Sequence, residues 1–153
     1  MSESGEVWVR PATRVIVIDG EGRTLLFRGI DPARPETPPW WFPPGGGRDE
    51  GETIEACGRR ELAEEIGLVV DDLGPVVHER RTTFSFDGRW IEAHESYFVV
   101  RVDSPEIVTD GWTEMERRVI AAHRWWTIDE LRSTTETVFP EALIELLETH
   151  TDG

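Results

Sequence analysis

The stretch that decides the fold of this chain runs from Gly46 to Leu68, with the sequence GGRDEGETIEACGRRELAEEIGL. A glycine-rich turn leads into a short predicted helix, and Gly67 is a typical helix C-cap. On this helix Glu61, Glu64 and Glu65 have the i, i+3, i+4 spacing that places side chains on one helical face. Like charges at this spacing repel, so the arrangement disfavours the helix unless a cation neutralises it.

The three crowded carboxylates predict a divalent-cation site. Mg²⁺ and Mn²⁺ prefer carboxylate and carbonyl oxygens, and one rigid helix with several carboxylates can hold more than one ion. The alternative is a solvated acidic helix face, which is the usual meaning of a short charge run. Taken alone, the charge run favours the solvated face, and the glycine turn together with the longer pattern described next favours the metal site.

The spacing within this stretch also resembles a family signature. From Gly46, five residues precede Glu52, seven more precede Arg60, and the segment continues as RELAEEIGL. This matches the Nudix box, G-x5-E-x7-R-E-U-x-E-E-x-G-U with U apolar, at nine fixed or restricted positions without a gap. The segment from Trp41 to Gly46 also resembles the W-x-x-P-G-G pattern of Nudix proteins. A match of this length is far more specific than a lone G-x-G-x-x-G.

The resemblance to Nudix hydrolases implies a fold and a reaction. The fold is an α/β/α sandwich with a mixed β-sheet in a single domain. The reaction is hydrolysis of a pyrophosphate bond in a nucleoside diphosphate linked to a moiety X. By the same resemblance the helix carboxylates bind Mg²⁺ or Mn²⁺, and the carbonyl of Gly45 adds an oxygen ligand. Glu52 and Arg60 would form an ion pair that braces the loop against the helix.

The general base is less well determined than the metal ligands. A base must lie within hydrogen-bond reach of the attacking water. We favour Glu64, with Glu61 beside it as a further catalytic carboxylate. The rivals are Glu114 and Glu116, in a loop and helix before the last strand, where the alternative role is to stabilise a helix N-terminus.

Two further carboxylates, Glu92 and Glu95, precede a predicted central strand. Their spacing of three residues places them on opposite faces of a regular strand, so at most one of them points at the metals.

Aromatic and basic residues outside the box are candidates for substrate binding. Trp40 and Trp41, beside the glycine loop, are expected to line a substrate pocket and to stack on a base. Arg28 and Arg81 are our candidates for gripping phosphate oxygens, and Arg14 and Arg80 share their strand context. Cys57 lies one turn before Glu61, on roughly the same helical face. We expect Cys57 to be a small buried hydrophobic residue.

Length and charge limit the classes of partner. At 153 residues the chain fits one domain, residues 1–153, of which residues 1–6 are expected to fray. The formal net charge of −15 and the absence of a run of Lys or Arg disfavour a nucleic acid polymer. The resemblance allows a homodimer, but the sequence shows no clear interface.

Cysteine content and hydropathy bear on the compartment. A single cysteine fits a reducing cytoplasm, and no signal peptide is expected because residues 1–10 carry acids and lack an apolar core. No apolar run approaches the ~18 residues of a membrane span.

The order of predicted elements is β-β-β-α-β-β-α-β-α. The apolar run from Val15 to Ile18 predicts a strand covered on both faces. The main predicted elements are strands at 8–19 and 24–27, a Pro-rich loop at 29–39, the box helix at 53–66, a hairpin of 76–86 and 89–102, a helix at 113–122, a strand at 124–127 and helices from 127 and 140. On the box helix, the apolar side formed by Ala56, Leu62, Ala63 and Ile66 is expected to pack on the sheet, opposite the carboxylates.

Three functions remain open at the level of sequence. The first is hydrolysis of a small nucleotide substrate, such as a nucleoside triphosphate, ADP-ribose, a nucleotide sugar or a dinucleoside polyphosphate. The second is a non-catalytic module that senses a nucleotide, although such a module would be expected to lose box carboxylates. The third is isomerisation of a prenyl diphosphate, which the intact hydrolase box disfavours.

Overall fold

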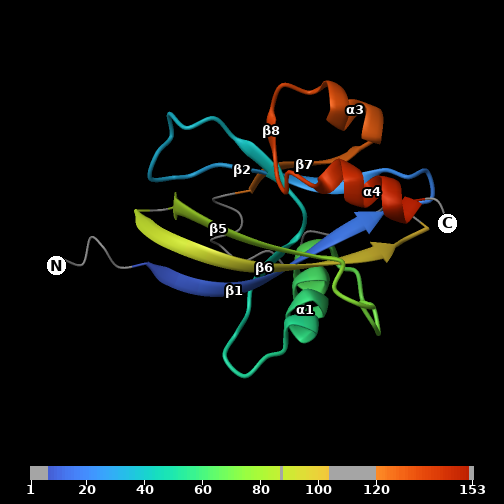
Figure 1. Ribbon diagram of the computed structural model, residues 1–153, viewed down its shortest axis with the longest axis horizontal. Helices are drawn as coiled ribbons and strands as arrows, with labels where there is room; N and C mark the ends of the chain where they lie inside the picture. Colours follow the sequence, from blue (N-terminus) through green and yellow to red (C-terminus); the bar gives the residue numbers. More distant parts are fainter. Residues whose placement is uncertain (1–6, 87, 104–119, 152–153) are drawn as a thin grey trace.

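The computed structural model describes residues 7–86, 88–103 and 120–151 (Figure 1). In chain order the elements are β1 (Trp8–Ile18), β2 (Thr24–Gly29), β3 (Trp40–Phe42), β4 (Gly45–Gly47), α1 (Ile54–Ile66), β5 (His78–Phe86), β6 (Arg89–Arg101), β7 (Ile120–Trp126), α3 (Ile128–Ser133), β8 (Thr137–Val138) and α4 (Leu143–Thr151).

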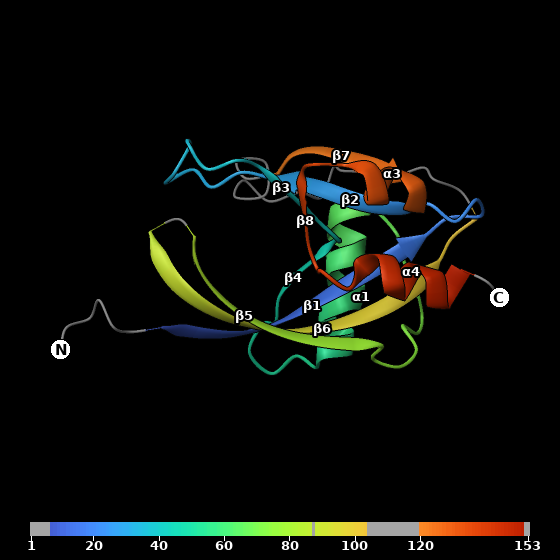
Figure 2. The ribbon, with the colours of Figure 1, turned by 45° about the horizontal axis from the view of Figure 1, so that its top comes forward.

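One mixed sheet organises these strands, in the order β5-β6-β1-β2-β3-β8, with β4 paired to β1 and β7 paired to β2. β1 lies parallel to β6 and antiparallel to β2 and β4. β1 and β2 pair only at Ile18 and Thr24, next to the turn that joins them. The sheet therefore opens into two arms, one containing β5, β6 and β1 and the other containing β2, β3 and β7 (Figure 2).

Apolar side chains cover both faces of the sheet. Val15 to Ile18 are at most 1% exposed, and their side chains alternate between two core clusters, as a doubly covered strand requires. One cluster contains Leu62 and Ile66 of α1 and the other contains Leu143 and Leu147 of α4. The helices thus lie on opposite faces, which confirms the predicted α/β/α arrangement.

Local sequence signals explain the bounds of α1. The Thr53 side chain accepts a hydrogen bond from the Ala56 amide at 3.0 Å, as an N-cap does. Gly67 ends the helix with a φ of 72°, a left-handed conformation that favours glycine. Gly58 allows close approach to the sheet, because a Cβ there would lie 2.9 Å from the Thr13 side chain.

The buried face of α1 differs from the prediction. Leu62 and Ile66 pack on the sheet as expected, but Ala63 is exposed. Glu61 and Glu65 are buried instead. The reason is that α1 packs not only on apolar strand residues but also against the glycine strand β4, where carboxylates find polar partners.

The region before the last strand was partly mispredicted. Ile120 to Ala122, assigned to the end of a helix, belong to strand β7. The rest of that predicted helix, with Glu114 and Glu116, lies outside the described residues. The final helix was predicted from Pro140 and begins at Leu143. Among the described residues, no helix is long and apolar enough to span a membrane.

Candidate active site

The glycine strand β4 brings the backbone into contact with α1. β4 pairs with β1 so that Gly45 lies opposite Arg14 and Gly46 opposite Thr13. Gly45 has a φ of 145°, and a Cβ there would lie 2.0 Å from the Thr13 carbonyl oxygen. A Cβ on Gly46 would lie 2.4 Å from Glu61 Oε2. Only glycine therefore permits this approach of strand and carboxylate.

Two carboxylates of α1 are buried against this strand. Glu65 is 2% exposed, and its Oε1 accepts a hydrogen bond from the Gly45 amide at 2.8 Å. Glu61 is 7% exposed and lies against Gly46. Cys57 is fully buried, and its Sγ donates to the Gly46 carbonyl at 3.4 Å. Burial raises the pKa of the Cys57 thiol, which suits the predicted role as a small buried side chain.

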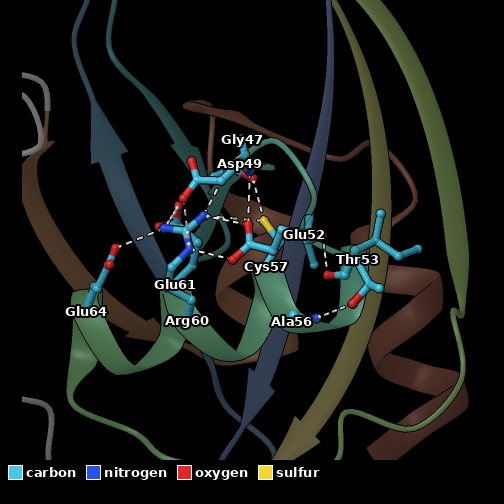
Figure 3. Close-up of polar contacts among 12 residues, drawn as sticks. Gly47, Asp49, Glu52, Thr53, Ala56, Cys57, Arg60, Glu61 and Glu64 are labelled. Carbon is cyan, nitrogen blue, oxygen red and sulfur yellow. Dashed lines mark hydrogen bonds and ion pairs between the residues drawn. The ribbon is translucent and has the colours of Figure 1, made fainter.

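Arg60 connects the box carboxylates (Figure 3). Its Nε and Nη2 donate to the two oxygens of Glu52 at 2.7 and 3.0 Å. Nη2 also donates to the Gly47 carbonyl at 3.2 Å, so the loop is joined to the helix. Nη1 lies 3.3 Å from Glu61 Oε2 and 3.2 Å from Glu64 Oε1. The hydrogen bonds from Arg60 lower the pKa of Glu52, and the same contacts raise the pKa of Arg60.

The donor set suits a hard divalent cation. Glu61, Glu64 and Glu65 line one cavity together with Gly45 and Gly46, so carboxylate and backbone oxygens are available in one place. The absent Cβ of Gly46 also leaves room for the side-chain oxygens of Glu61. Within the described ranges no three His, Cys, Asp or Glu side chains are arranged as a metal cage. Instead, the Arg60 guanidinium lies between two of the carboxylates.

The cavity beside these carboxylates has a volume of about 540 Å³ and lies between the two arms of the sheet. Three arginines line it from the sheet strands β1 and β5, namely Arg10, Arg14 and Arg80. Aromatic side chains line the remainder, namely Trp40, Phe42, Phe84, Phe86, Tyr97 and Phe139. A pocket with acidic, basic and aromatic parts is suited to a metal-bound phosphate ester that carries a planar ring.

The two predicted pocket tryptophans have different positions. Trp40 lines the cavity and contacts the Phe86 ring edge-on, with centroids 6.2 Å apart. Trp41 is 5% exposed, packs edge-on against Trp126 and donates to Glu136 at 2.9 Å. Trp41 is therefore a core residue and not a pocket residue. Neighbouring residues of a strand face opposite sides of the sheet, and that alternation is the signal that separates them.

The same alternation separates the arginines. The structure does not bring Arg28 or Arg81 to the cavity. Arg28 lies 3.8 Å from Glu136, and Arg81 is exposed beside Arg80 on β5. Arg10 lines the cavity without having been predicted.

The strand carboxylates also separate. Glu92 pairs with His94 at 2.6 Å. Glu95 is 9% exposed and lies among cavity arginines rather than on α1. Burial raises the pKa of Glu95, but Arg14, the Tyr97 hydroxyl and Arg80 outweigh that effect and lower it.

A family model described as the NUDIX domain matches residues 8–147. The chain belongs to the Nudix family. A relative from Caulobacter vibrioides, an RNA pyrophosphohydrolase, is 32% identical over 151 residues, which cover 92% of this chain and 83% of the relative. A prenyl-diphosphate phosphatase from Methanosarcina mazei is 30% identical over 119 residues, covering 71% of this chain and 65% of the relative.

Solved structures agree with the Nudix fold. The MutT NUDIX hydrolase from Burkholderia pseudomallei has a TM-score of 0.65 at 20% identity, over 94% of this chain and 98% of that chain. The predicted fold is therefore confirmed. The family model and the RNA pyrophosphohydrolase relative confirm the predicted enzyme class, so this protein is a Nudix hydrolase.

Proposed function

We propose that this Nudix hydrolase cuts a pyrophosphate bond in a nucleoside diphosphate linked to X, with Mg²⁺ or Mn²⁺ as cofactor. The observation that carries the proposal is the distribution of charge in the cavity. Glu61, Glu64 and Glu65 lie on the α1 side, and arginines lie on the sheet side. A diphosphate bound to a cation matches both walls.

The proposed ligands are the three α1 carboxylates together with the Gly45 carbonyl. A divalent ion held there would neutralise the diphosphate and polarise a water molecule. The Gly45 amide bond to Glu65 and the Arg60 bonds to Glu52 and Gly47 keep these donors in place. A bound cation would take the place that the Arg60 Nη1 group now holds between Glu61 and Glu64.

Glu64 is the proposed general base. Its side chain is 39% exposed, whereas the other two box carboxylates are buried, so water reaches it most readily. It would accept the proton of the attacking water at a carboxylate oxygen. The alternative bases are Glu114 and Glu116.

Trp40 is the proposed stacking partner for a nucleobase. It lies on the cavity wall beside Phe86, and an indole face stacks on any base. The substrate arginines are Arg10 and Arg14, in place of Arg28 and Arg81, because only the former pair lines the cavity.

A small nucleotide is the favoured substrate class. The net charge of −15 disfavours an extended polyanion. The second candidate is the 5′ end of an RNA, which the identity to the Caulobacter RNA pyrophosphohydrolase favours. We further infer one domain over residues 1–153 and a cytoplasmic location, because a single buried cysteine fits a reducing compartment.

The test is a phosphate-release screen of purified protein with Mg²⁺, with Mn²⁺ or with EDTA. The panel contains nucleoside triphosphates, ADP-ribose, nucleotide sugars, dinucleoside polyphosphates, a 5′-triphosphate RNA and prenyl diphosphates. The expected result is metal-dependent turnover, fastest on a small nucleotide. Fastest turnover of the RNA would favour the second candidate, and fastest turnover of a prenyl diphosphate would overturn the nucleotide proposal. Absence of turnover across the panel would favour the sensing module. Light scattering of the same sample tests for a homodimer.

A further inference from the structure

Glu95 lies at the centre of the basic wall of the cavity. On β5 its cross-strand partner is Arg80, and on β1 its partner is Ala12. Arg10 and Arg14 flank Ala12 at a spacing of two residues, so all of these side chains belong to one face of the sheet. Two guanidinium groups, those of Arg14 and Arg80, contact this buried carboxylate.

The two oxygens of Glu95 have different partners. Oε1 accepts hydrogen bonds from the Tyr97 hydroxyl at 2.7 Å and from Arg80 Nη1 at 2.9 Å. Oε2 lies 3.6 Å from Arg14 Nε. This division leaves Oε2 facing Arg14 as an ion pair.

Each of the three side-chain nitrogens of Arg80 has a protein partner. Besides Glu95, it donates to Glu141 at 3.1 and 3.5 Å and lies 4.9 Å above the Phe139 ring. It therefore joins β5 to the segment before α4 and has little capacity for a ligand.

Arg14 differs from Arg80 in its remaining donors. Its Nη1 donates to the Pro43 carbonyl at 3.3 Å, and the guanidinium lies 5.2 Å from the centre of the Phe42 ring. Within the part of the chain that the structure describes, its Nη2 donates no hydrogen bond. Since Arg14 lines the cavity, this group is a donor available to a ligand.

A second cation lies close to Arg14. Burial and repulsion from Arg14 lower the pKa of Arg10, which also lines the cavity, whereas Glu61 and Asp49 act in the opposite direction. Two like charges on a partly buried wall attract an anion, so these guanidinium groups favour a phosphate between them. The wall is therefore complementary to a phosphate group.

We propose that Arg14, oriented by Glu95, binds a substrate phosphate on the sheet side of the cavity, and that Glu95 is a positioning residue rather than a metal ligand. The inference rests on the proposed function, because it deepens the account of how the same cavity holds a diphosphate.

The test measures binding of inorganic pyrophosphate in EDTA by isothermal titration calorimetry, so neither metal nor turnover is needed. Arg14→Gln should weaken binding about tenfold, the loss expected for one charge-assisted hydrogen bond. The matched control is Arg81→Gln, because Arg81 is an exposed arginine of β5 that lies outside the cavity. Equal affinity for the Arg14→Gln variant and the parent would overturn the proposal.

Glu95→Gln distinguishes orientation from charge. If Glu95 acted only through its charge, removing it would make the wall more basic and tighten pyrophosphate binding. If it orients Arg14, the same variant should bind about fivefold to tenfold more weakly. Tighter or unchanged binding would overturn the positioning role.

A double-mutant cycle separates positioning from a general structural defect. Arg14→Gln combined with Glu95→Gln should bind no more weakly than Arg14→Gln alone, because Glu95 acts through Arg14. Additive losses would overturn the proposal. If Glu95→Gln does not fold, Arg14→Lys is measured in its place, because lysine keeps the charge and loses the guanidinium. Weaker pyrophosphate binding by Arg14→Lys would support an oriented guanidinium, and parent-like binding would overturn it.

Failure of this inference is distinguishable from failure of the proposed function. Pyrophosphate binding that depends on Arg14 would stand even if the phosphate-release screen found no turnover. Conversely, metal-dependent turnover together with pyrophosphate binding that does not depend on Arg14 would support the proposed hydrolase function and overturn the proposed phosphate site at Arg14.

Discussion

Arg60 and Glu52 are joined by two hydrogen bonds, from Nε at 2.7 Å and from Nη2 at 3.0 Å. The same guanidinium contacts Glu64 and the Gly47 carbonyl, so one side chain connects the loop to the carboxylates of α1. The loop geometry around the proposed metal site therefore depends on this pair.

Replacement of Arg60 should loosen the site without removing a metal ligand. We expect Arg60→Gln to lower the free energy of unfolding by about 1–2 kcal/mol, because partly exposed, charge-assisted hydrogen bonds are lost. Urea unfolding measures the change. Arg59→Gln is the control, since among the described residues Arg59 forms a half-exposed ion pair with Glu55 at 3.7 Å, worth under about 0.5 kcal/mol. Equal losses in both variants would contradict a bracing role.

Acid should weaken the contribution of Glu95 to stability. Its pKa is lower in the folded protein than the ordinary value of 4.5, so its stabilising contribution is present above that pH. The contribution is lost as the pH falls through the folded-state pKa. Glu95→Gln should cost about 1–3 kcal/mol at pH 7 and less at pH 3, which lies below the ordinary value. Urea unfolding at the two pH values tests this, and an undiminished difference at pH 3 would contradict it.

A methyl group on Gly46 should displace the carboxylate beside it. The Cβ of Gly46→Ala would lie 2.4 Å from Glu61 Oε2, so Glu61 must move away from the proposed metal site. We expect turnover to fall by about tenfold to a hundredfold, since small misplacements of a catalytic group have effects of this size. Gly20→Ala is the control, because a Cβ at Gly20 meets nothing within 4 Å. The measurement is phosphate release at saturating Mg²⁺.

Loss of the Glu64 carboxylate should remove the general base. We expect Glu64→Gln to reduce metal-dependent turnover by about 10²–10⁴-fold while the thermal unfolding curve is unchanged. Glu145→Gln, an exposed substitution on α4, is the control. Parent-like rates for Glu64→Gln would show that the assignment is wrong. A larger loss in Glu114→Gln or Glu116→Gln would transfer the role to that residue.

Trp40 should affect substrate binding more than the chemical step. We expect Trp40→Leu to raise KM for a nucleotide about tenfold, the loss expected when one base–aromatic contact is removed. The change in kcat should be small. Trp90→Leu is the control, because Trp90 is exposed on β6 and does not line the cavity. Equal KM values for the two variants would exclude stacking on Trp40.

Local patterns were enough to predict the helix and the central strand. The helix caps are Thr53 and Gly67, and the central strand contains the apolar run from Val15 to Ile18. Both features depend on residues that are close in sequence, so the sequence pattern alone predicts them. The Nudix box predicted the family because it specifies the spacing of residues along one helix and one turn.

The face of each strand was harder to predict. Trp40 and Trp41 are the same residue type, as are Arg80 and Arg81, so residue type does not tell which of each pair lines the cavity. A shift of one residue along a strand moves a side chain from the cavity face of the sheet to the opposite face. The role of Glu95 depends on partners from β1, β5 and β6, which are far apart in sequence. Predicting a site of this kind requires the register of the strands in the sheet, and the amino-acid composition of a strand does not determine its register.

β1 and β2 diverge with distance from their paired residues Ile18 and Thr24, and this divergence has a consequence for how the size of the cavity can change. The proposed metal ligands lie on α1, whereas residues of the β5–β6 hairpin and the 29–39 segment line other parts of the cavity. Insertions or deletions in those two segments would change the size of the cavity and leave the α1 carboxylates in place. A cavity of a different size can thus arise without a change in the proposed catalytic residues.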